Sequence, residues 1–448
     1  TERWVIMDLK TKDSFDFKSE RRSGKLFKRI ISGITAAAMA AGLLTTSAFA
    51  DEEVTYEHPS DINSVVDIMK NYAFIGFNEV DMNGHQHINL LVNKVVGLPG
   101  DMGIRKNYAG VYEYYVNKLP ENISGELKIG ENDPCVSNLT IGSDYTISTN
   151  GSERYIEPNH VKVSPSVTNI KAETATNKYI DLVNLQNSFI SYSAMLAENA
   201  DSTEGIGFNG QYDSSSNTWQ NINRINVTAE SGTVFYNIDD TNFSKINSDA
   251  IINFSDTSTA SIVLNIDLKN ISWDRKPFRL NIGGNQPTMN EDVILENNVN
   301  RIYYNFYDSS AADKMTTKTV SMTDAAHGTI IIPKGAAKVG SNWCGVIVAN
   351  NIGATGESHF VGAYNPVVPA SATVDVTVNK VWSEPSGQSH DGYYVKVDLM
   401  RSSAAETAQA IDNAILDSSN NFEYTFTGLK EKDADGNAYT YTVANDVT

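Results

Sequence analysis

The chain of 448 residues has 35 Lys and Arg residues against 54 Asp and Glu residues, a formal net charge of −19, and 41% hydrophobic residues. This length predicts roughly two to four domains, and the hydrophobic content is sufficient for folded cores, which excludes a wholly disordered chain. Because a phosphate backbone requires clustered Lys and Arg, the acidic balance argues against nucleic acid as a partner. In an exported protein such acidity most often serves solubility.

The N-terminal segment has the pattern of an export signal. Residues 25–50 combine a basic flank, an apolar run from Ile30 to Leu44, and small residues that end in AFA. The apolar run is too short and too rich in alanine for a membrane span. We therefore expect residues 1–50 to be an N-terminal extension and signal peptide, with cleavage before Asp51.

The chain that remains after this cleavage is more acidic. It keeps 26 basic residues (35 − 9) and 49 acidic residues (54 − 5), a net charge of −23. Met7 is a candidate for the true start, with the first six residues an over-extended reading frame.

Two cysteines, Cys135 and Cys344, occur in a chain whose expected compartment permits disulfides. One long-range disulfide is the first interpretation. The second is that Cys344, within the apolar run WCGVIVAN, is a buried thiol that acts as a small hydrophobic side chain.

Helical patterns are expected at two places in the first half of the chain. Ser60 and Asp61 are candidates to cap a short helix with apolar residues at helical spacing (Ile62, Val65, Val66 and Met69). Residues 176–200 predict a longer amphipathic helix, whose apolar stripe is Tyr179, Leu182, Val183, Phe189, Ile190 and Leu196.

Most of the remaining chain reads as short β-strands. Runs of β-branched and aromatic residues recur between turn residues, at 260–268, 300–308, 328–336 and 344–352. The segment NPVVPASA (365–372) has two prolines and small residues, which predicts the end of one β-rich domain and the start of a second, compact one.

The second domain carries a specific resemblance through four segments. They are VTVNKVW (376–382), VKVDLM (395–400), NNFEYTFTGL (420–429) and DADGNAYTYTV (433–443). In order and spacing they resemble the B-type domain of Gram-positive collagen adhesins and pilins, the Cna B-type stalk domain. The resemblance implies a small immunoglobulin-like β-sandwich, in which many members form a lysine-to-asparagine isopeptide bond.

The lysine of that bond falls on Lys380. Strand alternation places Lys380 in the same row as Val376, Val378 and Trp382, where burial would lower the lysine pKa and favour attack on an amide. The alternative is that Lys380 lies near a strand end and extends its ammonium group to water.

Two features of the family pattern are changed here. The glutamate that assists the bond falls on Asn445, and an amide cannot shuttle a proton as a carboxyl group can. The partner asparagine is expected beyond Thr448, so we expect a C-terminally truncated domain with no cross-link within these residues.

The larger domain is similar to the choice-of-anchor A domains of bacterial surface proteins. The similarity covers roughly residues 60–366 and is carried by the helix at 176–200 and by GHQHINLLV (84–92), GTVFYNI (232–238), IVLNIDL (262–268), IYYNFYD (302–308), GTIIIPKGA (328–336) and GESHFVGAYNP (356–366). It implies a mainly β fold, a right-handed β-helix-like β-solenoid with a flanking amphipathic α-helix, and the recurring short strands agree with stacked coils.

The resemblances together predict a non-enzymatic, exported adhesin of the cell surface or cell wall. Residues 51–366 are expected to bind a host, plant-fibre or cell-surface ligand, protein or glycan. Residues 367–372 are the expected linker and residues 373–448 the Cna B-type unit, with cell-wall attachment through a missing C-terminus. No cofactor is expected.

The alternative is a carbohydrate-binding module or polysaccharide-active enzyme on a β-solenoid. A lyase of that kind needs clustered acidic residues for calcium and a basic residue to take a proton, and no such cluster is visible in the sequence. The weak alternative of a metal site rests on His85, His87, Glu357 and His359, whose spacing by two places each pair on one strand face. More often such residues close the ends of a solenoid by hydrogen bonding.

Overall fold

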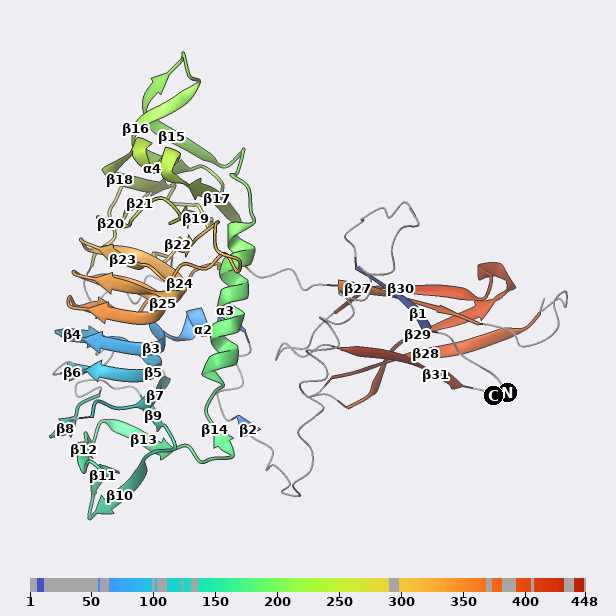
Figure 1. Cartoon of the computed structure of the whole chain (residues 1–448), viewed down its shortest axis with the longest axis horizontal. Helices are drawn as coiled ribbons and strands as arrows, with labels where there is room; N and C mark the ends of the chain where they lie inside the picture. Colours follow the sequence, from blue (N-terminus) through green and yellow to red (C-terminus); the bar gives the residue numbers. More distant parts are fainter. Residues whose placement is uncertain are drawn as a thin grey trace, which may run out of the picture. The chain divides into compact units, whose positions relative to one another are not determined.

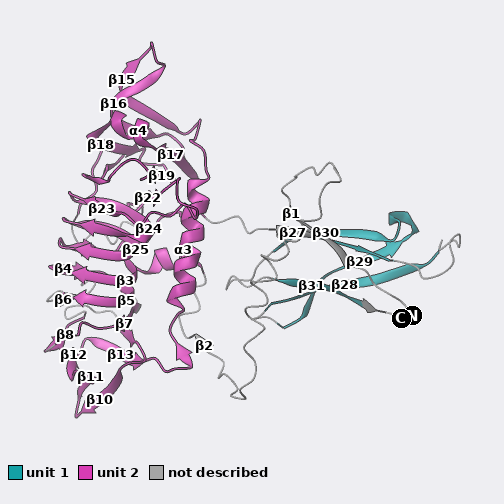
Figure 2. Ribbon diagram, in the orientation of Figure 1, with its two compact units in different colours: residues 1–53, 370–448 teal, residues 54–369 magenta. Residues whose placement is uncertain are grey.

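The computed structural model divides the chain into two compact units, coloured separately in Figure 2. The large unit is Val54–Pro369, and the small unit combines Thr1–Glu53 with Ala370–Thr448. The structure describes residues 6–11, 55–56, 64–98, 101–102, 111–121, 123, 125–129, 136–289, 298–367, 373–380, 392–403, 407–430 and 439–446. The expected signal peptide core and Cys135 lie outside these residues.

The large unit is built from short strands that pair mostly in parallel (Figure 1). Its first half contains β2 (Thr55–Tyr56), α2 (Val65–Asn71), β3 (Phe74–Met82), β4 (His85–His87), β5 (Leu90–Gly97), β6 (Asp101–Met102), β7 (Val111–Lys118), β8 (Glu126–Leu127), β9 (Val136–Ile141), β10 (Thr146–Asn150), β11 (Glu153–Glu157), β12 (Val161–Val163), β13 (Val167–Ala172) and β14 (Asn177–Lys178). The second half follows the long helix α3 (Leu182–Ala197). It contains β15 (Ile206–Asp213), β16 (Thr218–Val227), β17 (Thr233–Ile238), α4 (Asp240–Lys245), β18 (Ile246–Phe254), β19 (Ser261–Asp267), β20 (Asp274–Arg275), β21 (Arg279–Ile282), β22 (Ile302–Tyr307), β23 (Thr319–Met322), β24 (Ala326–Val339), β25 (Trp343–Ala354) and β26 (Ser358–His359).

The strand order shows how the two halves meet. The main sheet runs β13-β9-β7-β5-β3-β25-β24-β22-β19-β17, with every neighbouring pair parallel. The chain therefore begins in the middle, builds outward to β13, crosses to the far end and builds back until β25 lies beside β3. The main sheet ends at β13 and at β17, which do not pair with each other. These strand pairings alone therefore do not establish the coils of the expected β-solenoid.

Both faces of the central strands of the main sheet are buried, which explains their continuous apolar runs. Along GTIIIP, Ile330 packs into the larger core cluster and Ile331 packs into a second cluster with the helices, and both are 0% exposed. Parallel strands covered on both faces read as unbroken hydrophobic segments rather than alternating ones. The mainly β character expected from the sequence is confirmed by the structure.

Helix α3 carries the chain across the sheet (Figure 1). Its 16 residues give a length of about 24 Å, about five strand spacings, and it contacts β24, β22, β19 and β3. The helix predicted at 176–200 is confirmed over Leu182–Ala197, but Tyr179 lies before it and the predicted stripe was partly wrong. Val183 is 70% exposed, and the buried residues are Leu185, Phe189, Tyr192, Ser193 and Leu196. Positions 185, 189, 192 and 196 keep the period of 3.6, which Val183 does not share.

The short helix α2 begins later than predicted. Its N-cap is Ser64, whose Oγ accepts a hydrogen bond from the Asp67 N–H at 3.2 Å. Ser60 and Asp61, the predicted caps, lie outside the described residues. Among the helices that the structure describes, none combines the length and the hydropathy needed to cross a membrane.

Three asparagines in one column fix helix α3 on the sheet. Asn237, Asn265 and Asn305 are aligned across β17, β19 and β22. Asn305 donates to Ser193 O at 3.0 Å and to Asn265 Oδ1 at 2.9 Å, Asn265 donates to Leu196 O at 2.7 Å, and Asn237 donates to Asn199 O at 3.1 Å. The Leu196 carbonyl also accepts from the Asn199 N–H at 3.3 Å, so this column adds side-chain donors to the carbonyl groups at the helix C-terminus.

The small unit has two three-stranded sheets. One has the order β1-β27-β30 (Ile6–Thr11, Thr373–Asn379 and Glu423–Lys430), and the other has the order β29-β28-β31 (Gln409–Asp417, Tyr394–Ser402 and Thr440–Asp446). A compact core fills it, with Val376, Val378, Val397, Leu399, Ala414, Leu416 and Phe426 buried. The pairing of β1 with β27 places a segment of the expected N-terminal extension in this unit.

Two aligned glycines allow β24 and β25 to approach closely. Gly328 pairs with Gly345, and their φ angles are +145° and +152°, a region that favours glycine. A Cβ on Gly345 would lie well inside van der Waals contact with the Gly328 carbonyl oxygen. Gly353, on the same strand, has only ordinary contact with Lys338 Cγ at 3.6 Å.

We predict that Gly345→Ala lowers the free energy of unfolding by about 2–4 kcal/mol, because the methyl group meets backbone that cannot move without disturbing the ladder. Gly353→Ala is the matched control on the same strand and should change it by less than about 1 kcal/mol. Chemical denaturation followed by circular dichroism measures both. Equal stability of the two variants would contradict the close approach.

Candidate functional site

The four residues of the predicted metal alternative are brought together at β4 and β26. These strands are parallel, with His359 paired to His87 and Ser358 paired to Gln86. His87 Nε2 lies 3.0 Å from Glu357 Oε1, and His359 Nε2 lies 3.7 Å from the same oxygen. The imidazole rings of His85 and His87 are stacked at 6.3 Å, and those of His87 and His359 at 5.3 Å.

This histidine cluster continues into the core through neighbouring strands. His327, Cys344, His359 and His87 occupy paired positions on β24, β25, β26 and β4. Burial lowers the pKa of His327 to about 4, against the opposing effect of a hydrogen bond to the Thr288 carbonyl. At neutral pH the His327 imidazole is therefore neutral and donates from Nε2 to Thr288 O at 3.0 Å.

Cys344 is a buried, free cysteine. Burial, with a smaller contribution from the charge of Glu357, raises the pKa of its thiol to about 12. Such a thiol is a poor nucleophile and a poor metal ligand at neutral pH, because both roles require the thiolate. The interpretation of Cys344 as a small hydrophobic side chain therefore fits its surroundings.

The cluster links two strands through one carboxylate. The imidazoles of His87 and His359 both lie near the same carboxylate oxygen of Glu357, and these contacts connect β4 with the turn before β26. In the part of the chain that the structure describes, no group of three or more His, Cys, Asp or Glu residues is arranged to hold a metal ion.

Lys380 lies directly after the last residue of β27. Val376 and Val378 are buried as predicted, whereas Lys380 is half-buried and its backbone N–H donates to Phe422 O at 2.9 Å. Asn445 belongs to β31 and pairs with Val397. Trp382 lies outside the described residues.

A second polar surface was missed by the sequence analysis. It lies on β16, β18 and β21, where Arg224, Ile251 and Arg279 form one row and Asn226, Asn253 and Asn281 form the next. The signal was present as a repeated pattern, RINV at 224–227, IINF at 251–254 and RLNI at 279–282. We call this surface the Arg–Asn face.

Two families match the chain in succession. The family model described as "Putative Ice-binding-like adhesive domain" matches residues 66–360. The chain belongs to this ice-binding-like adhesive family. The Cna protein B-type domain matches residues 376–448, so the predicted order, an adhesive domain followed by a Cna B-type domain, is confirmed. Searches of curated proteins and of solved structures found no match.

We predict that burial of neutral His327 makes the large unit sensitive to acid. Its pKa of about 4 lies below the ordinary value of 6.5, so between these pH values the unfolded state binds more protons and stability falls as pH falls. The wild-type chain should lose about 3 kcal/mol more unfolding free energy between pH 7 and pH 4 than His327→Gln, which keeps a donor without titrating.

Urea unfolding at several pH values measures this difference. His85→Gln is the matched control, because it replaces a histidine that is exposed on β4 and not buried in the core, and this variant should keep the wild-type pH dependence. A His327→Gln profile parallel to that of the wild-type chain would show that His327 is not held neutral.

Proposed function

We propose that this chain is an exported, non-enzymatic surface adhesin, in which the large unit binds an external ligand and the Cna B-type unit is the base of a stalk. The observation that supports it most directly is the succession of the two family matches, residues 66–360 and 376–448. Adhesive and Cna B-type domains are typical of secreted surface proteins.

The proposed architecture of the large unit is a β-solenoid. Three observations support it: the parallel pairing along the whole main sheet, the one-to-one register of residues across successive strands, and the stacking of β4 with β26 and β6 beside that sheet. In this arrangement the bulges within β3 and β25 mark corners between successive faces.

A binding role suits the rigidity of this scaffold. The central strands of the main sheet are buried on both faces, and the Glu357 carboxylate, a candidate acid–base group, lies close to two imidazoles. We propose a ligand on a host, plant-fibre or cell surface, export through residues 1–50, a linker at 367–372 and attachment to the cell wall. The boundaries 51–366 and 373–448 are proposed for the two domains.

We predict that the purified chain binds at least one of four materials, insoluble cellulose or immobilised pectin, mucin or collagen. It should not degrade the material that it binds. Release of reducing ends should stay at the level of a protein-free blank. Reproducible depolymerisation that disappears in the Glu357→Gln variant would replace this proposal with a polysaccharide-active enzyme. Absence of binding to every surface would contradict adhesion.

We predict that protein exported from a Gram-positive host has the intact mass of residues 51–448 without loss of ammonia. Cleavage before Asp51 removes the signal peptide, and an isopeptide bond at Lys380 would release one ammonia, so one mass spectrum tests both. A Lys380→Arg variant is the control, because it cannot form the bond. Retention of residues 25–50 would contradict the export signal, and a branched peptide containing Lys380 would contradict the unlinked state.

A further inference from the structure

The Arg–Asn face is a regular polar surface on the large unit. Arg224, Ile251 and Arg279 are paired residues of β16, β18 and β21, so their side chains leave the same side of the sheet. Arg279 is exposed, and Arg224 and Ile251 are partly exposed. Neighbouring strands lie about 4.8 Å apart, so the two arginine backbones are separated by about 10 Å, on either side of Ile251.

The second row of the face is a chain of amides. Asn253 Nδ2 donates to Asn226 Oδ1 at 3.4 Å, and Asn226 Nδ2 donates to Asn209 Oδ1 at 2.5 Å. Each amide nitrogen carries two hydrogens, so each retains one donor beyond this chain. Asn281, the third residue of the row, is buried, so Asn226 and Asn253 present the donors, one strand spacing apart, a length comparable to one hexose ring in an extended polysaccharide.

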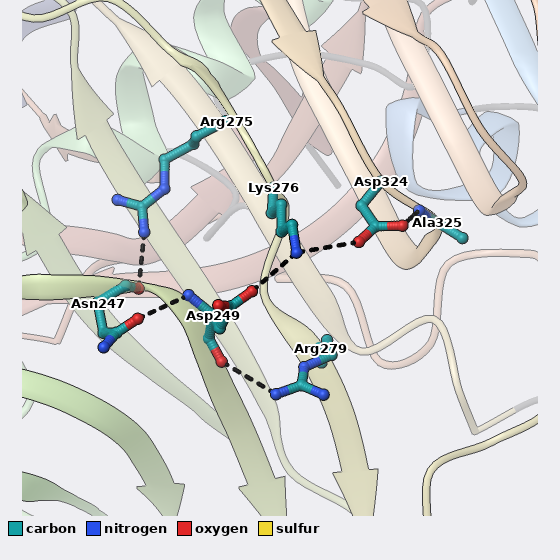
Figure 3. A network of polar contacts seen from close by, with 7 residues as sticks. All are labelled: Asn247, Asp249, Arg275, Lys276, Arg279, Asp324 and Ala325. Carbon is teal, nitrogen blue, oxygen red and sulfur yellow. Dashed lines mark hydrogen bonds and ion pairs between the residues drawn. The ribbon is translucent and has the colours of Figure 1, made fainter.

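A polar network holds Arg279, one of the two arginines of the row, in place (Figure 3). Arg279 Nη2 donates to the Asp249 carbonyl at 3.3 Å, and Arg275 Nη2 donates to the Asn247 carbonyl at 2.7 Å. The Arg275 guanidinium also stacks over Phe243, Trp273 and Phe278. These contacts use only part of the five donors of Arg279, so its remaining donors are available to a ligand.

The same network also contains two carboxylates, which share one lysine. Lys276 Nζ lies 3.1 Å from Asp249 Oδ1 and 3.7 Å from Asp324 Oδ2, as Figure 3 shows. Three cations, Arg275, Lys276 and Arg279, lie around these two carboxylates, and Asp274 precedes Arg275 on β20. Asp256 lies beside Gly283, past the end of the amide row. In a chain of net charge −19, the attraction for an anion therefore comes from the outward-facing guanidinium groups of Arg224 and Arg279.

We infer that the Arg–Asn face binds an anionic polysaccharide whose carboxylate groups are taken by Arg224 and Arg279 and whose hydroxyl groups are taken by the asparagine row. This assignment rests on the proposed adhesive function and names its ligand class. A guanidinium group can donate two parallel hydrogen bonds to one carboxylate. An amide can both donate a hydrogen bond to a hydroxyl group and accept one from it. A nucleic acid is disfavoured because its dense charge would meet the acidic remainder of the chain.

The test measures binding of the full chain to immobilised polygalacturonate, which carries carboxylates, to heparin, which carries sulfates and carboxylates, and to dextran, which carries no charge. We expect binding to polygalacturonate that weakens as salt rises, and no comparable binding to dextran. The double variant Arg224→Gln/Arg279→Gln should bind at least about tenfold more weakly, since two charge-assisted contacts are lost.

The matched control is Lys118→Gln/Lys338→Gln, which removes the same charge from exposed positions on other strands of the large unit. It should bind within about twofold of the wild-type chain, and the thermal midpoints of all variants should agree. Arg224→Lys/Arg279→Lys keeps the charge without the fork, and intermediate binding would support bidentate recognition.

Several outcomes would overturn the inference. Equal binding to dextran, binding to heparin alone, or equal losses in the arginine and lysine double variants would each do so. If the chain binds a surface of the adhesion panel but not polygalacturonate, this inference alone fails. If it binds neither, the proposed adhesive function fails with it.

Discussion

The large unit depends on the buried asparagine column that joins helix α3 to the sheet. Asn265 and Asn305 are 0% exposed, and every hydrogen bond lost there would leave a buried polar group without compensation. Apolar packing alone allows a helix to slide along a sheet. The donors to Ser193 and Leu196 instead fix one position, so α3 delivers the chain to the level at which β15 begins.

That position determines the topology of the whole unit. Helix α3 carries the chain past the positions of strands that come later in the sequence. The second half of the unit can therefore be completed only by strands that return toward β3. The last long strand, β25, then pairs with the first, β3, across a sequence separation of more than 250 residues. The Arg–Asn face lies on strands that follow α3, and the histidine cluster forms where β26 of the return path pairs with β4 of the first half.

Much of the fold could be predicted from the sequence, because β-branched runs and a helical period are local signals. The strands at 260–268, 300–308, 328–336 and 344–352 and the long helix are confirmed. The buried stripe of α3 was partly wrong, since Val183 looks apolar but only tertiary contacts show that it faces water. The meeting of His87 with Glu357 depends on a pairing between distant segments, which no local pattern encodes. The Arg–Asn face was missed although the repeat RINV, IINF and RLNI is visible in the sequence, because each four-residue segment alone has the composition of an ordinary strand.

The central location of β25 has a mechanical consequence. Traction applied through the C-terminal end of the large unit first meets the backbone hydrogen bonds from Phe360 to His87, from Ala363 to Met69 and from Tyr364 to Asn300. Beyond them lies a strand bonded along both edges, to β24 and to β3. An edge strand can be peeled away one bond at a time, whereas a strand held on both sides must shear two ladders together. The point where tension enters is thus among the most strongly braced parts of the sheet.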